Sequence, residues 1–153
     1  MDKHQVLEQI RAAKAAHIRW VQKAKLLIEG FEMDKDSIPI NSTECKFGVW
    51  FYSDAQQLNS LRNNSLECMG SVETLHFQLH DIYLQIFKLY YDVGEKGFFA
   101  KLFGSKKKVN DETIEKGRKY FSELEGVSKE LLVEINRLER RIIAIPEEEL
   151  ADL

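Results

Sequence analysis

The sequence predicts an all-α protein, and three observations carry that prediction. Only 2 prolines and 8 glycines interrupt a chain of 153 residues. Long stretches are rich in Leu, Lys, Glu and Ala, residues that favour helix. Apolar residues recur in steps of three and four, which is the spacing of one helical face. With 44% hydrophobic and 31% charged residues, the chain has an ordinary globular composition and is long enough to bury a core.

The first predicted helix covers residues 3–31. Its apolar face includes His17, at a position where a leucine would be expected. Gly30 and the segment 33–43 then predict a break, because Pro39 lacks an amide hydrogen and disfavours helix just before it. The predicted inward face consists of Val6, Ile10, Ala13, His17, Trp20, Ala24, Leu27, Ile28 and Phe31.

The aromatic-rich segment 45–55 begins with one of the two cysteines, Cys45. Its Val, Trp, Phe and Tyr residues favour strands. Nothing nearby offers a second strand for pairing, so the segment is predicted to form a short helix or a tight turn. Ser42 or Thr43 is the predicted N-cap.

A second long helix is predicted to begin near Asn64 or Ser65 and to continue to about Phe103. Its predicted inward stripe is Met69, Val72, His76, Leu79, His80, Tyr83, Ile86, Phe87 and Tyr90.

A last helix is predicted from a cap at Asn110 or Asp111 to Ile145, and Pro146 ends it. Its stripe nearly matches a heptad seam, which also suits packing against a partner. We therefore expect one domain over residues 1–146 and a loose acidic tail over 147–153. The predicted stripe is Leu124, Val127, Leu131, Ile135, Leu138 and Ile142.

The positions of histidine and cysteine carry the chemical information. His76 and His80 lie one helical turn apart, so their imidazoles can converge on one cation. His17 points inward from another helix, and Cys45 lies in an apolar segment that must fold against the bundle. Three imidazoles and one thiolate complete a tetrahedral site, and this soft donor set favours zinc over magnesium or calcium.

A plainer interpretation is that these are core histidines whose nitrogens are satisfied by hydrogen bonds. Two histidines at this spacing arise often by chance. Three inward histidines are harder to explain in this way, because each buried imidazole needs polar partners. The spacing alone leaves both interpretations open.

Three short segments together resemble the signatures of the chemoreceptor zinc-binding (CZB) domain family. They are His17-Ile-Arg-Trp20, Cys45-Lys-Phe-Gly-Val-Trp-Phe-Tyr52 and His76-Phe-Gln-Leu-His80. Their order matches the family pattern, as does the separation of 28 positions between His17 and Cys45. The resemblance covers residues 6–91, and its second block is highly specific.

The resemblance implies an antiparallel four-helix bundle with a short additional helix carrying the cysteine ligand, usually paired as a homodimer. It implies Zn²⁺ bound by His17, Cys45, His76 and His80. Members of the family are cytoplasmic bacterial sensors, attached to chemoreceptor or diguanylate cyclase modules or standing alone. They are linked to the sensing of zinc or of oxidants through the ligand cysteine. No such output module is recognisable in this sequence.

The remaining features argue against other classes of function. Four protein ligands close a zinc site, and Phe77 occupies the place where a zinc hydrolase motif has glutamate, so we expect no enzymatic activity. The net charge of −3 provides no general attraction for nucleic acid. No apolar run approaches the length of a membrane span, and the start of the chain does not resemble a signal peptide. We therefore expect a zinc-binding sensory or regulatory domain, or else a helical dimerisation module in which zinc only staples the fold.

Overall fold

A computed structural model describes residues 2–61, 67–91 and 109–153 of the chain. The described residues form helices and contain no strand, so the predicted all-α class is confirmed. The elements are α1 (Lys3–Ile28), α2 (Lys46–Phe51), the 3₁₀ helix η1 (Asp54–Ser60), α3 (Glu67–Tyr90), α5 (Asp111–Ala144) and α6 (Glu147–Ala151).

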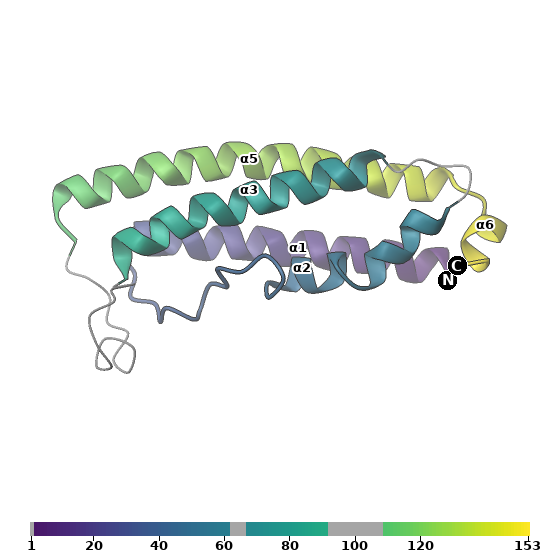
Figure 1. Ribbon diagram of the computed structural model, residues 1–153, viewed down its shortest axis with the longest axis horizontal. Helices are drawn as coiled ribbons and strands as arrows, with labels where there is room; N and C mark the ends of the chain where they lie inside the picture. The colour runs from purple at the N-terminus through teal and green to yellow at the C-terminus, as the bar shows by residue number, and fades with distance from the viewer. Residues whose placement is uncertain (1, 62–66, 92–108) are drawn as a thin grey trace.

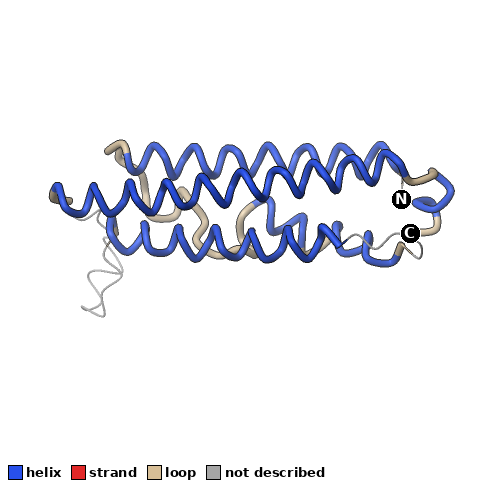
Figure 2. The backbone as a smooth tube through the Cα atoms, turned by 90° about the horizontal axis from the view of Figure 1, so that it is seen from above, coloured by secondary structure: helices blue, strands red, loops and turns tan. Residues whose placement is uncertain are grey.

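The long helices α1, α3 and α5 lie lengthwise beside one another (Figures 1 and 2). Helix α5 packs against both α1 and α3 and runs antiparallel to them. Helices α2 and η1 run back along α1 and occupy the position of the second helix in an up-down-up-down bundle (Figure 1). The predicted antiparallel bundle is therefore present, and α2, the short helix next to Cys45, forms part of its second helical segment.

The end of α1 differs from the prediction by one turn. Gly30 has a φ of 96°, which L side chains rarely adopt. The amide of Gly30 donates to the Leu27 carbonyl, and the amide of Phe31 donates to the Leu26 carbonyl. This pattern is a Schellman C-cap, so the helix stops before Phe31. The Phe31 side chain is 57% exposed, so its predicted place on the inward face is wrong.

The predicted apolar stripes form the core. In α1 every predicted position except Phe31 is buried, and all the predicted positions of α3 are buried as well. The heptad-like seam of α5 is buried within its own bundle, where Leu124, Leu131 and Ile142 have no exposed surface. The suggestion that this seam packs against a partner is therefore wrong, because α1 and α3 already cover it.

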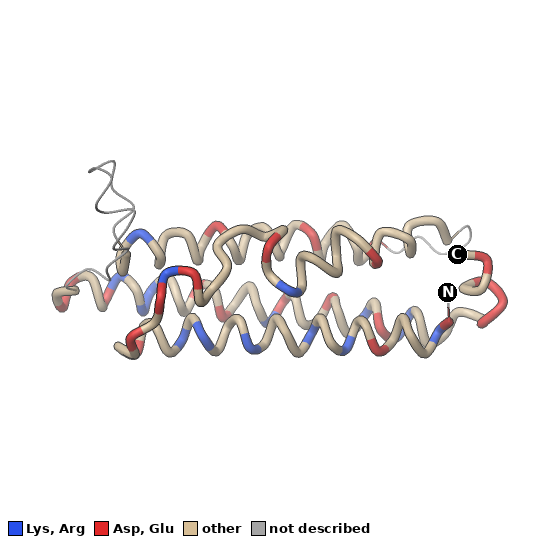
Figure 3. The backbone as a smooth tube through the Cα atoms, turned by 90° about the horizontal axis from the view of Figure 1, so that it is seen from below, with Lys and Arg blue, Asp and Glu red and all other residues tan. Residues whose placement is uncertain are grey.

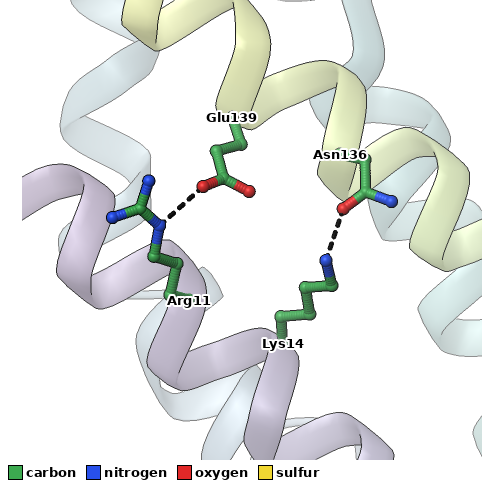
Figure 4. Close-up of polar contacts among 4 residues, drawn as sticks. All are labelled: Arg11, Lys14, Asn136 and Glu139. Atoms are coloured by element: carbon green, nitrogen blue, oxygen red, sulfur yellow. Dashed lines mark hydrogen bonds and ion pairs between the residues drawn. The ribbon is translucent and has the colours of Figure 1, made fainter.

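Polar contacts link α1 and α5 at the edge of the core. The Arg11 guanidinium lies 2.6 Å from a carboxylate oxygen of Glu139. One turn further along α1, the Lys14 ammonium donates to the Asn136 side chain at 2.6 Å. Figure 4 shows the two contacts side by side along the antiparallel helices. Elsewhere on the long helices, basic and acidic positions are interspersed (Figure 3).

The acidic C-terminal segment is ordered, which corrects the expectation of a loose tail. Pro146 ends the preceding helix as predicted, and α6 begins at the next residue. Leu150 is fully buried, and α6 packs against α1. Leu150 therefore anchors a segment that is mostly acidic, and Leu153 also packs against the core.

The predicted start of the second long helix, at 64 or 65, lies outside the described residues. The helix was predicted to continue to 103, but α3 ends at Tyr90 and Tyr91 is not helical. None of the described helices combines the length and the apolar character that crossing a bilayer requires.

Candidate metal centre

Cys45 lies at the start of α2 and is its N-cap, whereas Ser42 or Thr43 was the predicted cap. The Gly48 amide donates to the Cys45 sulfur at 3.2 Å, and the sulfur lies 3.5 Å from the Ser42 carbonyl oxygen. The thiol is 4% exposed. The turn into α2 therefore places the sulfur inside the bundle and holds it from two sides.

Gly48 makes this turn possible. A Cβ atom at this position would lie 1.6 Å from the Ser42 carbonyl oxygen and 3.2 Å from Cε1 of His76. Only a residue without a side chain allows the backbone at Ser42 to pass so close to α2. Gly48 therefore lets α2 lie close to the chain before it and to the His76 side chain.

His76 and His80 project from adjacent turns of α3 toward Cys45. Nε2 of His76 lies 3.2 Å from the Cys45 sulfur. The two imidazole centres are 4.8 Å apart, with their planes nearly perpendicular. Nδ1 of His80 lies 2.6 Å from the Ile40 carbonyl oxygen. A carbonyl oxygen only accepts, so Nδ1 of His80 carries the proton and Nε2 keeps its lone pair for a metal.

His17 faces the same region from α1 but makes a different contact. It is 3% exposed, and its Nε2 lies 2.8 Å from the hydroxyl oxygen of Ser128 on α5. Its ring centre is 6.2 Å from that of Phe47, which also packs against His76. His17 thus borders the site, but its nitrogens do not join the closest group of donor atoms.

That closest group consists of Cys45, His76 and His80, whose donor atoms all lie within 4.8 Å of one another. Donor atoms around a tetrahedral zinc ion are about 3.3 to 3.8 Å apart, given the usual Zn–S and Zn–N bond lengths. The observed 3.2 Å between sulfur and His76 Nε2 is near that range. The donor set and its convergence therefore fit zinc, and His17 as the fourth ligand stays a prediction.

Hydrogen bonds satisfy the nitrogens of the three buried histidines only in part. Ser128 and the Ile40 carbonyl satisfy one nitrogen each on His17 and His80. Nδ1 of His76, however, is buried and has no hydrogen-bond partner among the described residues. A buried polar atom without a partner is costly. The interpretation of satisfied core histidines is therefore incomplete at His76, and a metal held by Nε2 would leave Nδ1 without a partner as well.

Burial keeps the histidines in the form that binds metals. It lowers the pKa of His17 to about 4 and that of His76 to about 3, and the neighbouring His80 adds to both shifts. Burial also lowers the pKa of His80, against the smaller opposite effects of the Ile40 carbonyl and Asp81. All three imidazoles are neutral near pH 7.

The cysteine behaves in the opposite sense when no metal is bound. Burial raises the pKa of the Cys45 thiol, and the backbone hydrogen bond from Gly48 opposes this only in part. The metal-free thiol is therefore protonated near pH 7. It must lose its proton to bind a metal, since the thiolate is the form that coordinates.

Aromatic rings surround the donor atoms. The ring centres of Trp20 and His80 lie 4.7 Å apart, and those of Phe47 and His76 lie 4.8 Å apart. The Trp20 indole also donates to the Pro39 carbonyl at 3.1 Å, which anchors the chain next to Ile40. Trp20 and Phe47 therefore pack beside the donor atoms.

A cavity of about 180 Å³ connects the site with the surface. The four predicted ligands form part of its lining, together with Trp20 and Phe47. Exposed residues of α1 and α2 also line it, namely Arg19, Lys23 and Lys46. The cavity gives a small solute a route to the buried donor atoms.

The sequence prediction missed the groups that orient the ligand histidines. Ser128 offered a signal, because it is one helical turn from both Leu124 and Leu131 and thus a polar residue within an apolar stripe. The carbonyl groups of Pro39 and Ile40 offered none, because every residue has a carbonyl and only the folded path of the chain directs these two.

Comparison with known proteins agrees with the geometry. Residues 17–87 match the family model described as the chemoreceptor zinc-binding domain. No curated protein and no solved structure gives a significant match. The matched range contains every predicted ligand and runs from α1 through α2 to α3. Residues 17–87 of this chain therefore belong to the chemoreceptor zinc-binding domain family.

Proposed function

We propose that this chain is a zinc-binding sensory or regulatory domain of bacterial signalling, of the chemotaxis or cyclic-di-GMP type. The observation that carries the proposal is the convergence of one buried cysteine and two buried histidines within 4.8 Å. The residues come from separate segments of the chain, so a metal bound there connects the α2 region with α3.

In this proposal the Cys45 thiolate and the imidazoles of His76 and His80 hold the ion, and His17 supplies the fourth donor. The bound Zn²⁺ would supply charge that stabilises the thiolate and would hold these elements together. The Ile40 carbonyl keeps His80 in the tautomer whose Nε2 can coordinate.

We further propose that the site does not catalyse a reaction. Four protein donors leave no position for a water molecule, which a catalytic zinc requires. The converging group contains no carboxylate to act as a general base. Phe77 follows His76 directly, in the place of the glutamate of zinc hydrolases.

An oxidant is one candidate signal. A hydroperoxide would transfer its terminal OH group to the Cys45 thiolate, forming sulfenic acid and releasing the remaining oxygen as hydroxide or alkoxide. Sulfenic acid is a poorer zinc ligand than thiolate. Loss of this ligand would loosen α2, because the same sulfur accepts the Gly48 hydrogen bond at the start of that helix. Zinc availability itself is the other candidate signal.

The proposed cellular setting follows the family. The chain would act in the cytoplasm as a homodimer and pass its signal to an output domain or protein. The apolar face of α5 is covered within one chain, so dimer contacts would involve outward-facing residues, such as those on the exposed side of α1.

The alternative is a structural module in which zinc only staples the helices. Deep burial of the donor atoms favours slow exchange, as a staple would require. The cavity beside the donor atoms favours access from solvent, as a sensor would require. Zinc affinity and exchange distinguish the two functions.

The test is chelator competition on the zinc-loaded protein, with and without hydrogen peroxide. A sensor releases zinc to the chelator while still folded, or releases it on oxidation, and Cys45→Ala weakens binding and abolishes the peroxide response. Cys68→Ala is the matched control, because Cys68 is the other buried cysteine and lies outside the cluster. Zinc retained until unfolding, with or without peroxide, would contradict sensing and favour the staple.

A further inference from the structure

Helix α5 provides none of the predicted ligands, yet it contacts one of them through a buried side chain. The hydroxyl of Ser128 lies 2.8 Å from Nε2 of His17. Ser128 is 6% exposed and belongs to the buried face of α5, between Leu124 and Leu131. A buried hydroxyl in such a stripe is costly unless it is hydrogen-bonded, and His17 is its partner.

We propose that Ser128 is a positioning residue that orients His17 for Nδ1 coordination and brings α5 into the metal site. This inference rests on the proposed function, since it assumes that His17 binds the ion. With Nε2 engaged by Ser128, Nδ1 is the ring nitrogen left for a metal. A histidine ligand commonly donates its other N–H to a polar group that fixes its tautomer and orientation.

The chemistry of serine suits both states of such a site. A hydroxyl can donate and accept. Without metal, the Ser128 hydroxyl can donate to an unprotonated Nε2 or accept from a protonated one. When Nδ1 coordinates, Nε2 must carry the proton and donate to the Ser128 oxygen. Alanine at this position would leave that N–H buried without a partner, which disfavours the coordinated state.

The contact also couples metal binding to α5, the longest helix. His17 is on α1 and Ser128 is on α5, 111 positions later in the chain. The same two helices are joined by Arg11 with Glu139 and by Lys14 with Asn136 (Figure 4). Tightening the His17–Ser128 bond on metal binding would therefore strengthen a pairing that already exists, and would slow amide exchange in α5 around Ser128.

The test uses the full chain and two measurements. The first is nitrogen-15 NMR of the histidine rings with NMR-active cadmium as the probe, which identifies the metal-bound nitrogen of His17 by its coupling. We expect coupling at Nδ1 and a protonated Nε2. The second is zinc affinity by chelator competition for Ser128→Ala, with Ser122→Ala as the control, since Ser122 is an exposed serine of the same helix.

We expect Ser128→Ala to weaken zinc binding by about 10- to 100-fold, and Ser122→Ala to leave it unchanged. Coupling at Nε2 of His17, or an unchanged affinity in Ser128→Ala, would overturn the inference. Binding through Cys45, His76 and His80 with no coupling at His17 would overturn it as well, while leaving the metal site in place. Wild-type protein that binds no metal would overturn the proposed function together with the inference.

Discussion

Replacing Gly48 with alanine tests how tightly α2 is held against the site. The added Cβ would lie 1.6 Å from the Ser42 carbonyl oxygen, where ordinary contact begins at 3.4 Å. The obstructing atom belongs to the backbone, so a rotamer change cannot relieve the clash. The backbone around Ser42 would have to move away from α2, and both segments contact the Cys45 sulfur.

The expected magnitude combines two opposing terms. Overpacking a tightly packed site typically costs about 1 to 3 kcal/mol, and a clash with backbone belongs at the upper end. Alanine in place of glycine stabilises a helix by about 1 kcal/mol. We therefore expect the free energy of unfolding of the metal-free protein to fall by about 2 kcal/mol. Because the sulfur is displaced, we also expect zinc affinity to fall by about 10-fold or more.

Urea unfolding followed by circular dichroism at pH 7 measures the change in stability. Gly126→Ala is the matched control, because its Cβ would meet no atom within 4 Å. That substitution should raise the free energy of unfolding by about 1 kcal/mol, through helix propensity alone. If Gly48→Ala proved as stabilising as the control and bound zinc normally, the described packing of Ser42 against α2 would be wrong.

Three further predictions concern stability. Acid should destabilise the metal-free protein, because His17 and His76 have pKa values of about 4 and about 3 in the folded state. Below pH 6.5 the unfolded chain therefore binds more protons than the folded chain does, which favours unfolding. Each should contribute a loss of about 2 kcal/mol between pH 7 and pH 5, and stability independent of pH in that window would contradict their burial. Tyr83→Phe should leave the free energy of unfolding unchanged or raise it by about 1 kcal/mol, because the buried Tyr83 hydroxyl has no hydrogen-bond partner among the described residues. A clear fall in this free energy, measured by urea unfolding, would reveal an unrecognised partner. Arg11→Ala should change the free energy of unfolding by less than about 1 kcal/mol, since the Arg11 side chain is 59% exposed. A larger loss in the same assay would show that its contact with Glu139 is more than a surface ion pair.

Much of the fold follows from helical periodicity. The predicted faces of α1 and α5 became buried because a step of three or four residues allows only one side of a helix to meet the core. The end of α1 was misjudged at Phe31, although Gly30 carried the signal, because apolar spacing continued past the capping glycine. The order of the C-terminal segment was missed because its two leucines, Leu150 and Leu153, are too few among acidic residues to show a periodicity.

The candidate site was predictable to a smaller extent. The spacing of His76 and His80 predicts their convergence, because one helical turn fixes it. The approach of Cys45 depends on a turn that only Gly48 permits, and no periodic pattern encodes it. Hydrogen bonds from distant elements, such as that between Ser128 and His17, depend on how the helices pack and are visible only in three dimensions.

The most direct test of the central claim is the metal content of the purified protein by elemental analysis, for wild type and for His80→Ala. His4→Ala is the control, because the His4 side chain is 75% exposed and lies near the start of α1, away from the cluster. We predict about one zinc per chain in wild type and in the control, with zinc lost or much weakened in His80→Ala. No zinc in wild type purified without chelator, and none taken up on titration, would contradict the account and leave a helical domain with histidines in its core.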